Sequence, residues 1–209
     1  MDTIEKTLAG YPGKIVLIVA HGRNGEIGKG KDMPWGRSFP SDLKWFNRVT
    51  TSFGAAVLVV GKTTYDTLPQ KVINDPTRTF AILTSKVREV TPTGNNYYVP
   101  NVTELCNYFG ERDFIIIGGG KVYDLFYPRA DMVFTTLIHN TWPDKTTSVT
   151  MAGGLRRYIV KRKDIANLDN SGLAVTIVLE FHVELADSTG YYEHITGALL
   201  DDYWDNLKQ

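Results

Sequence analysis

Asp42 and Phe46 stand four residues apart, shortly after the loop sequence Met-Pro-Trp-Gly at 33–36. If Ser41 caps a helix that begins near Pro40, this spacing places the carboxylate and the aromatic ring on one helix face. An unpaired acid that faces an apolar slot is costly for folding, so its presence favours a binding role. The ligand chemistry that fits such a slot is a flat heterocycle with polar edges.

A second candidate site is the run of three glycines at Gly118, Gly119 and Gly120, which follows an apolar stretch and precedes Lys121. Glycines at the start of a helix let backbone N–H groups approach an anion such as a phosphate. A tight strand-to-helix turn explains the same run equally well. The spaced-glycine fingerprint of dinucleotide-binding folds is absent, so this pattern alone does not imply a dinucleotide.

The sequence Gly61-Lys62-Thr63-Thr64 also follows an apolar run and begins a helix-like segment. It lacks the first glycine of a phosphate-binding Walker loop, and by itself a capped helix is the simpler interpretation. Two such helix starts at the ends of parallel strands fit a ligand with two separated phosphates. Together, therefore, the two segments favour a dinucleotide.

Apolar runs of strand length, separated by segments of helix length, predict an α/β fold. Strands that are hydrophobic on both faces are typical of a mostly parallel central sheet flanked by helices on both faces. The strands are predicted at 15–20, 55–60, 80–83, 114–117 and 132–137, and the helices at 42–50, 62–68, 102–109 and 121–126.

The C-terminal third predicts an antiparallel edge to this sheet. An alternating strand at 174–184 and a shorter one at 191–195 read as a hairpin that closes the sheet edge. Residues 1–13 are expected to be a leader and 14–196 one domain, with 145–173 as an atypical insertion. Residues 197–209 carry apolar side chains at helical spacing and predict an amphipathic tail helix.

Composition restricts the partners. The 209 residues contain 23 Lys and Arg and 23 Asp and Glu, so no net field recruits nucleic acid or an anionic membrane. The basic stretch Arg156–Lys163 is expected to be a solvated face. The single cysteine, Cys106, cannot form an internal disulfide, and no signal peptide, membrane span or metal-ligand spacing is evident. A small-molecule substrate and a cytoplasmic location are the expectations.

In order and spacing, five segments between Ile15 and about Leu137 resemble the dihydrofolate reductase family, with a looser similarity at 174–195. The segments are Ile27-Gly28 with Met33-Pro34-Trp35, Asp42-Leu43-x-Trp45-Phe46, Val60-Gly61-Lys62-x-Thr64-Tyr65, Pro76-x-Arg78 before Leu83-Thr84-Ser85, and Ile117-Gly118-Gly119-Gly120-Lys121-Val122-Tyr123.

This resemblance implies reduction of 7,8-dihydrofolate to tetrahydrofolate with NADPH, for one-carbon metabolism and thymidylate synthesis. The acid that matches Asp42 holds the amino group and a ring nitrogen of the pterin and promotes protonation of N5 through water. Hydride then passes from the nicotinamide to C6. Trp35 would share the catalytic site, and the cofactor would supply the reducing chemistry.

The resemblance also assigns binding residues position by position. Substrate contacts are implied for Ala20, Leu43, Phe46, Arg78 and Thr136, with Phe46 beside the aminobenzoyl ring, Arg78 on the α-carboxylate and Thr136 supporting the acid. Cofactor contacts are implied for Ala20, Ile27, Gly28, Gly61, Lys62, Thr63, Thr64, Leu83, Thr84, Ser85, Ile117, Gly118, Gly119, Gly120, Lys121, Val122 and Tyr123.

The chain departs from the family pattern at several positions. Residues 36–39 lengthen the loop after Trp35 by about two residues relative to compact members. Thr77 replaces a usual glycine before Arg78, and Lys62 replaces a more usual arginine at the 2′-phosphate, which softens the expected preference for NADPH over NADH. The alternatives are a pterin or riboflavin-pathway reductase, and an assembly protein that docks or self-associates through the tail.

Overall fold

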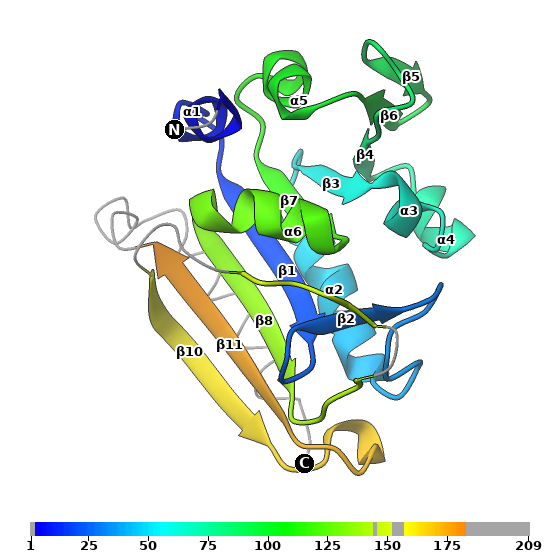
Figure 1. Cartoon of the computed structure of the whole chain (residues 1–209), viewed down its shortest axis with the longest axis vertical. Coiled ribbons are helices and arrows are strands. Elements are labelled where there is room, and N and C mark those ends of the chain that lie inside the picture. Colours follow the sequence, from blue (N-terminus) through cyan, green and yellow to red (C-terminus); the bar gives the residue numbers. More distant parts are fainter. Residues whose placement is uncertain (1–2, 144–145, 152–156, 183–209) are drawn as a thin grey trace.

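The computed structural model describes residues 3–143, 146–151 and 157–182. Within these residues the main sheet has nine strands in the order β10-β11-β8-β1-β7-β3-β4-β6-β5, and a two-stranded sheet pairs β2 with β9 (Figure 1). The strands of the main sheet are β1 (Ile15–His21), β3 (Val57–Gly61), β4 (Thr79–Leu83), β5 (Thr91–Thr93), β6 (Asn96–Val99), β7 (Phe114–Gly118), β8 (Met132–Ile138), β10 (Arg157–Ile165) and β11 (Val175–His182). The small sheet contains β2 (Glu26–Lys29) and β9 (Thr146–Ser148).

The centre of the main sheet is parallel, from β8 through β1, β7, β3 and β4 to β6. Its strands are buried on both faces because successive side chains alternate between two hydrophobic clusters. In β1, Val16 and Ile18 point into one cluster, whereas Leu17 and Val19 point into the other. Continuous apolar runs therefore predicted these strands correctly, and the mostly parallel α/β fold is confirmed.

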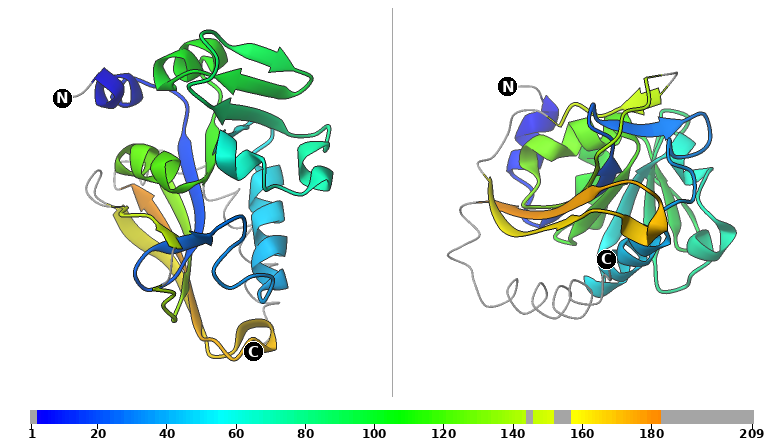
Figure 2. Two further views of the ribbon diagram at one scale, coloured as in Figure 1. Left: turned by 45° about the vertical axis from the view of Figure 1, so that its right-hand side comes forward. Right: turned by 90° about the horizontal axis from the view of Figure 1, so that it is seen from below.

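Helices cover both faces of the sheet (Figure 2). On one face, α2 buries Trp45 and Val49, and α3 buries Tyr65. On the other face, α5 and α6 bury Leu105 and Phe126. The helices are α1 (Thr3–Ala9), α2 (Pro40–Ser52), α3 (Lys62–Tyr65), α4 (Gln70–Ile73), α5 (Val102–Phe109) and α6 (Gly120–Phe126), with 3-10 turns η1 (Tyr127–Arg129) and η2 (Leu168–Asn170).

The four predicted helices are present, but α3 is shorter than the predicted range 62–68. After Tyr65 the chain continues as a turn, in which the N–H groups of Thr67 and Leu68 bond the carbonyl oxygens of Thr64 and Tyr65, three residues back, and Pro69 ends this turn. The short helix α1 was not predicted, because residues 1–13 were expected to be a simple leader. Its Leu8 is 3% exposed and joins the cluster that contains α5, which explains why so short a segment is helical.

The antiparallel strands at the C-terminal edge are confirmed, but the partner of β11 differs from the prediction. β11 pairs with β8 on one side and with β10 on the other. The basic stretch that we interpreted as a solvated face is thus largely strand β10. An edge strand that carries several charges has a weak hydrophobic signal, which is why the sequence pattern missed it.

Several predictions fall on residues that are not described. The second hairpin strand at 191–195 and the amphipathic tail at 197–209 lie outside the described residues, so both stay predictions from sequence. Among the helices of the described ranges, none combines the length and the apolar character that crossing a bilayer requires.

A buried carboxylate connects the loop after β1 to the loop after β8. Glu26 is 2% exposed, and its two oxygens accept the backbone N–H groups of Asn24, at 2.8 Å, and Trp142, at 3.0 Å. Burial alone would raise the pKa of Glu26, but the backbone hydrogen bonds outweigh burial and hold this pKa below its ordinary value. The charged carboxylate therefore stabilises the fold.

Glu26→Gln is expected to lower the free energy of unfolding at neutral pH by about 1–3 kcal/mol, because an amide NH2 then faces a backbone donor. A carboxyl group with a depressed pKa stabilises the fold above its unfolded-state pKa, and this contribution disappears as the pH falls through the folded-state pKa. The difference between variant and wild type should therefore shrink in acid. Urea unfolding at several pH values measures it, with the exposed Glu111→Gln as control. Equal losses at neutral and acidic pH would contradict this explanation.

Candidate active site

Asp42 lies in the first turn of α2, where it meets the end of strand β8. Its Oδ1 accepts a hydrogen bond of 2.7 Å from the Thr136 hydroxyl, and Thr136 is 3% exposed. Thr136 is also the register partner of Ala20 on β1. The structure thus brings together three of the predicted substrate residues from three separate elements. Asp42 itself is only partly buried, so a ligand can reach it.

The surroundings of Asp42 favour its neutral form. Burial raises the pKa of Asp42 to about 6, the negative charge of Asp169 adds to this rise, and the hydrogen bond from Thr136 opposes it. A carboxyl group with this pKa exists in both protonation states within the ordinary physiological range. It can therefore accept hydrogen bonds from a cationic or amino-bearing ring and also take part in proton transfer.

The prediction that Ser41 caps α2 is wrong. The capping position is Phe39, which makes no side-chain hydrogen bond to the helix, and Pro40 is the first helical residue. Ser41 instead donates its backbone N–H and its hydroxyl to the carboxylate of Asp169, at 2.8 Å and 2.5 Å. Asp169 is 128 residues away in sequence, so no local capping pattern could reveal it.

Aromatic side chains pack together beside the loop that precedes α2. Trp35 is 7% exposed. The centroid of its ring lies 6.5 Å from the ring centroid of Phe39 and 5.5 Å from that of Trp142. Sequence reasoning missed Trp142, which comes from the loop after β8. On α2, Phe46 is partly buried against the same cluster, whereas Leu43 is 46% exposed. A partly exposed apolar face next to Asp42 fits a substrate with a flat ring.

The glycine run forms a turn in which a side chain at Gly118 or Gly119 would clash with neighbouring atoms. Gly118 has a φ of +110°, and a Cβ there would lie 2.8 Å from the ring of Tyr123. A Cβ at Gly119 would lie 2.6 Å from the hydroxyl of Thr64. The tight-turn interpretation of this run is thus visible in the structure, in which Gly118 and Gly120 are buried and Gly119 is partly exposed. The turn places the two glycine-containing segments, around 61–64 and 118–120, side by side.

The ring of Tyr123 packs against this turn at Gly118. Its hydroxyl donates a hydrogen bond of 2.8 Å to the carbonyl oxygen of Ile18 on β1. Burial, and to a lesser degree the charge of Asp42, raise the pKa of Tyr123, so the phenol stays protonated and remains a donor. Tyr123 therefore links the glycine turn to the strand that also carries Ala20.

The remaining predicted cofactor residues surround these two segments. Ile27 approaches Gly120, since its Cδ1 lies 3.6 Å from the position that a Cβ on Gly120 would occupy. Leu83, Thr84 and Ser85 form the end of β4 and the turn that follows it. Lys62 forms an ion pair with Asp66, with Nζ 2.5 Å from Oδ1, so its charge is already partly compensated. The others, Gly28, Thr63, Ile117, Lys121 and Val122, lie on or beside β2, α3, β7 and α6.

Arg78 is a buried cation that binds to the side of α2. It is 3% exposed; its Nη2 donates to Oδ1 of Asn47, and its Nε lies 3.2 Å from Oδ2 of Asp75. Burial lowers the pKa of Arg78, while Asp75 opposes this effect. Thr77, which departs from the family pattern, donates its hydroxyl to Asp75 at 2.6 Å and so orients the carboxylate beside Arg78. Within the described residues, Nη1 of Arg78 is buried without a hydrogen-bond partner.

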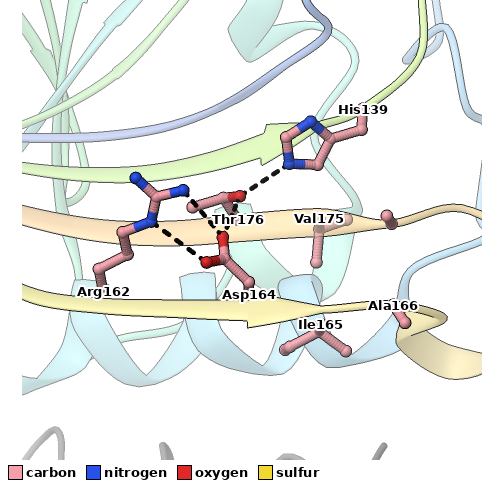
Figure 3. Close-up of a pocket in the computed structure, with 8 residues that line it drawn as sticks. His139, Arg162, Asp164, Ile165, Ala166, Val175 and Thr176 are labelled. Atoms are coloured by element: carbon pink, nitrogen blue, oxygen red, sulfur yellow. Dashed lines mark hydrogen bonds and ion pairs between the residues drawn. The ribbon is translucent and has the colours of Figure 1, made fainter.

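A separate cavity of about 340 Å³ lies at the antiparallel edge of the sheet (Figure 3). None of the predicted site residues lines it. Its polar groups satisfy one another, because Thr176 donates to Asp164 and bonds His139, and Arg162 pairs with Asp164. No group of three or more His, Cys, Asp or Glu side chains in the described part of the chain could hold a metal ion. The region around Asp42 remains the candidate active site.

Comparisons with known proteins show which family the sequence matches. A sequence model described as dihydrofolate reductase matches residues 14–170. The chain is 30% identical over 123 residues to the dihydrofolate reductase of Ureaplasma parvum, which covers 58% of this chain and 73% of that protein. The dihydrofolate reductase of Haemophilus influenzae is also 30% identical over 123 residues, with 58% and 70% covered.

The fold resembles a solved structure of dihydrofolate reductase from Enterococcus faecalis, complexed with NADP(H) and the compound RAB-propyl. The TM-score is 0.64 at 24% sequence identity, and the match covers 83% of this chain and 98% of the other. At this level of identity, the likeness supports the fold.

Asp42→Asn is expected to raise the free energy of unfolding at about pH 8, by up to roughly 3 kcal/mol, because it removes a partly desolvated charge. A carboxyl group with a raised pKa loses stability as the pH rises from its ordinary value of 3.8 to about 6. The gain should therefore shrink towards zero as the pH falls through that interval. Urea unfolding at several pH values measures it, with the exposed Glu89→Gln as control. A gain that is independent of pH would contradict the proposed cause.

Proposed function

The chain belongs to the dihydrofolate reductase family, and we propose that Asp42, Thr136 and Trp35 form the site at which it reduces its substrate. The enzyme is a dihydrofolate reductase, which converts 7,8-dihydrofolate to tetrahydrofolate with NADPH. Tetrahydrofolate serves one-carbon metabolism and nucleotide synthesis. The partner of the enzyme is thus a small-molecule substrate.

The assignment of the site rests on the hydrogen bond between Asp42 and Thr136. Thr136 takes up only part of the accepting capacity of Oδ1, so Oδ1 and Oδ2 of Asp42 can each accept a hydrogen bond, one from the amino group and one from the ring nitrogen of a pterin. Such a bidentate contact fixes the ring in one orientation, and orientation supplies much of the rate in hydride transfer. With a pKa near 6, Asp42 also promotes protonation of N5 through water.

The residues around the glycine turn fit a dinucleotide. Any Cβ at Gly119 would fill the space beside the Thr64 hydroxyl, so the backbone of this turn and Thr64 are positioned to bind the pyrophosphate of NADPH. Ala20 and Tyr123 would support the nicotinamide end. When bound, NADPH supplies the hydride. Because Lys62 already pairs with Asp66, we propose that Ser85 and Lys121 share the contact to the 2′-phosphate.

Arg78 supports folate rather than a smaller pterin as the substrate. Its buried Nη1 has no partner among the described residues, and a carboxylate is the ligand that satisfies a guanidinium best. A pterin or riboflavin-pathway substrate lacks the glutamate tail that carries such a group. Leu43 and Phe46 lie on the same helix as Asn47, which binds Arg78, and would contact the aminobenzoyl ring between the two polar ends.

Other parts of the proposal rest on the sequence. A cytoplasmic location agrees with a single cysteine, Cys106, which is free and buried. Self-association or protein docking through residues 197–209 stays a proposal, since those residues lie outside the described ranges. Deletion of 197–209 tests it: loss of assembly with full reductase activity supports docking, whereas a monomeric wild type contradicts self-association.

Asp42→Asn is expected to slow the reductase by at least about a hundredfold near neutral pH, because an amide can neither hold the pterin in the same way nor assist protonation. NADPH binding should change little, since the glycine turn is untouched. NADPH absorbance followed with and without added dihydrofolate measures turnover, and NADPH fluorescence measures binding. The matched control is Lys44→Gln, an exposed position on the same helix. Absence of dihydrofolate-dependent oxidation in the wild type would refute the proposed function.

Arg78→Lys is expected to raise the KM for dihydrofolate by roughly 10–100-fold while kcat changes little, because lysine cannot form the bidentate contact to a carboxylate. A dihydropterin that lacks the glutamate tail should be reduced equally well by variant and wild type. Steady-state kinetics with both substrates makes this comparison, and the exposed Arg88→Lys serves as control. A similar loss with the tail-less substrate would mean that Arg78 acts on the fold and not on the tail.

A further inference from the structure

Asp169 has an unusual backbone conformation in the turn η2, between β10 and β11. Its φ is +56°, and the next residue, Asn170, has a φ of +55°. Aspartate and asparagine enter this left-handed region more readily than other non-glycine residues, because their short polar side chains form local hydrogen bonds. The contacts of the Asp169 side chain, and not the backbone conformation alone, therefore indicate what this residue does.

The task visible in the structure is to cap α2. Oδ2 of Asp169 accepts the Ser41 backbone N–H at 2.8 Å, and Oδ1 accepts the Ser41 hydroxyl at 2.5 Å. The residue at the capping position of the helix, Phe39, makes no side-chain hydrogen bond to it. Since the first N–H groups of a helix have no partner within it, Asp169 provides from another part of the chain what the local sequence lacks.

The capped turn is the one that carries the catalytic acid. Ser41 directly precedes Asp42, and Asp42 in turn bonds Thr136 on β8. The first turn of α2 is thus held at two consecutive residues, by Asp169 on one and by Thr136 on the next. Without the bond at Ser41, this first turn would lose a hydrogen bond that limits fraying, and the carboxyl group would sample more orientations.

The turn that carries Asp169 is itself firmly anchored. Leu168, next to it, is 1% exposed and belongs to the hydrophobic cluster beneath α2. Just before the turn, Asp164 accepts the Thr176 hydroxyl at 2.5 Å, and Thr176 bonds Nε2 of His139 at 2.7 Å (Figure 3). These contacts join the ends of β10, β11 and β8, so Asp169 projects from a fixed support.

We propose that Asp169 is a positioning residue for dihydrofolate reduction, which holds the first turn of α2 so that the carboxyl group of Asp42 meets the substrate in one orientation. This inference rests on the proposed function of Asp42. The hydrogen bonds, not the charge, are the essential feature, because a second negative charge near Asp42 opposes its ionisation. An asparagine at 169 can bond both groups of Ser41 without the charge, if its Oδ1 accepts the Ser41 backbone N–H and its NH2 group donates to the Ser41 hydroxyl oxygen.

The test compares Asp169→Gly, Asp169→Asn and Asn170→Gly in the full chain. Asp169→Gly should reduce kcat/KM for dihydrofolate at least about tenfold, because small errors in orientation are costly in catalysis. Its free energy of unfolding should stay within about 1 kcal/mol of wild type, since relief of the left-handed conformation offsets the lost cap. Asp169→Asn should restore kcat/KM to within about threefold of wild type, and the matched control Asn170→Gly should leave it within about twofold.

Two measurements separate positioning from general structural damage. The dissociation constant for NADPH should be the same in all three variants, because the glycine turn does not contact Asp169. Hydrogen exchange at the amides of residues 40–46 should become faster in Asp169→Gly alone.

The inference is overturned if Asp169→Gly keeps kcat/KM within about threefold of Asn170→Gly, or if Asp169→Asn loses as much as Asp169→Gly. Unchanged amide exchange at the start of α2 in Asp169→Gly would also overturn it. An inactive wild type, in contrast, would refute the proposed function and would leave the exchange measurement as an independent test of the cap.

Discussion

A carboxyl group kept partly out of water at the start of α2 is the constraint on which the rest of this structure depends. Placing Asp42 there costs folding free energy, because burial and the charge of Asp169 both resist its ionisation. The hydrogen bond from Thr136 offsets only part of this cost, so the pKa of Asp42 stays raised. What results is an acid whose pKa is raised to about 6, on a helix that is held at both Ser41 and Asp42.

The fold meets this constraint by bringing distant segments to the carboxyl ends of the parallel strands. Adjacent strands β1 and β8 place Ala20 opposite Thr136, and α2 crosses above them with Asp42. The glycine turn after β7 approaches Thr64 at the start of α3, because β3 and β7 are neighbours in the sheet. Tyr123 connects these regions, because it packs against Gly118, bonds Ile18 on β1 and feels the charge of Asp42, although more than 70 positions separate Asp42 from Gly118 in the printed sequence.

The sequence predicted well those elements whose local hydrophobic pattern matches their burial in the folded protein. Continuous apolar runs predicted β1, β3, β4, β7 and β8, because strands buried on both faces need no polar alternation. The failures come from contacts that are remote in sequence. Strand β10 is an edge strand with a weak apolar signal, α1 is helical because Leu8 packs on the core, and Trp142 reaches Trp35 from another loop. Expected cofactor and substrate roles for individual residues stay predictions, since they concern ligands.

The sequence by itself determined the chemistry of this protein: an acid and an aromatic ring at helical spacing, glycines where a backbone must come close, and an arginine ahead of an apolar strand. These are properties of residue type and short-range spacing, which the linear chain already contains. Only the tertiary structure decided what surrounds them, including the partner that caps α2, the raised pKa of Asp42 and the ion pair that compensates Lys62. Burial and electrostatic fields arise from groups that meet only after folding, so they are absent from any local pattern.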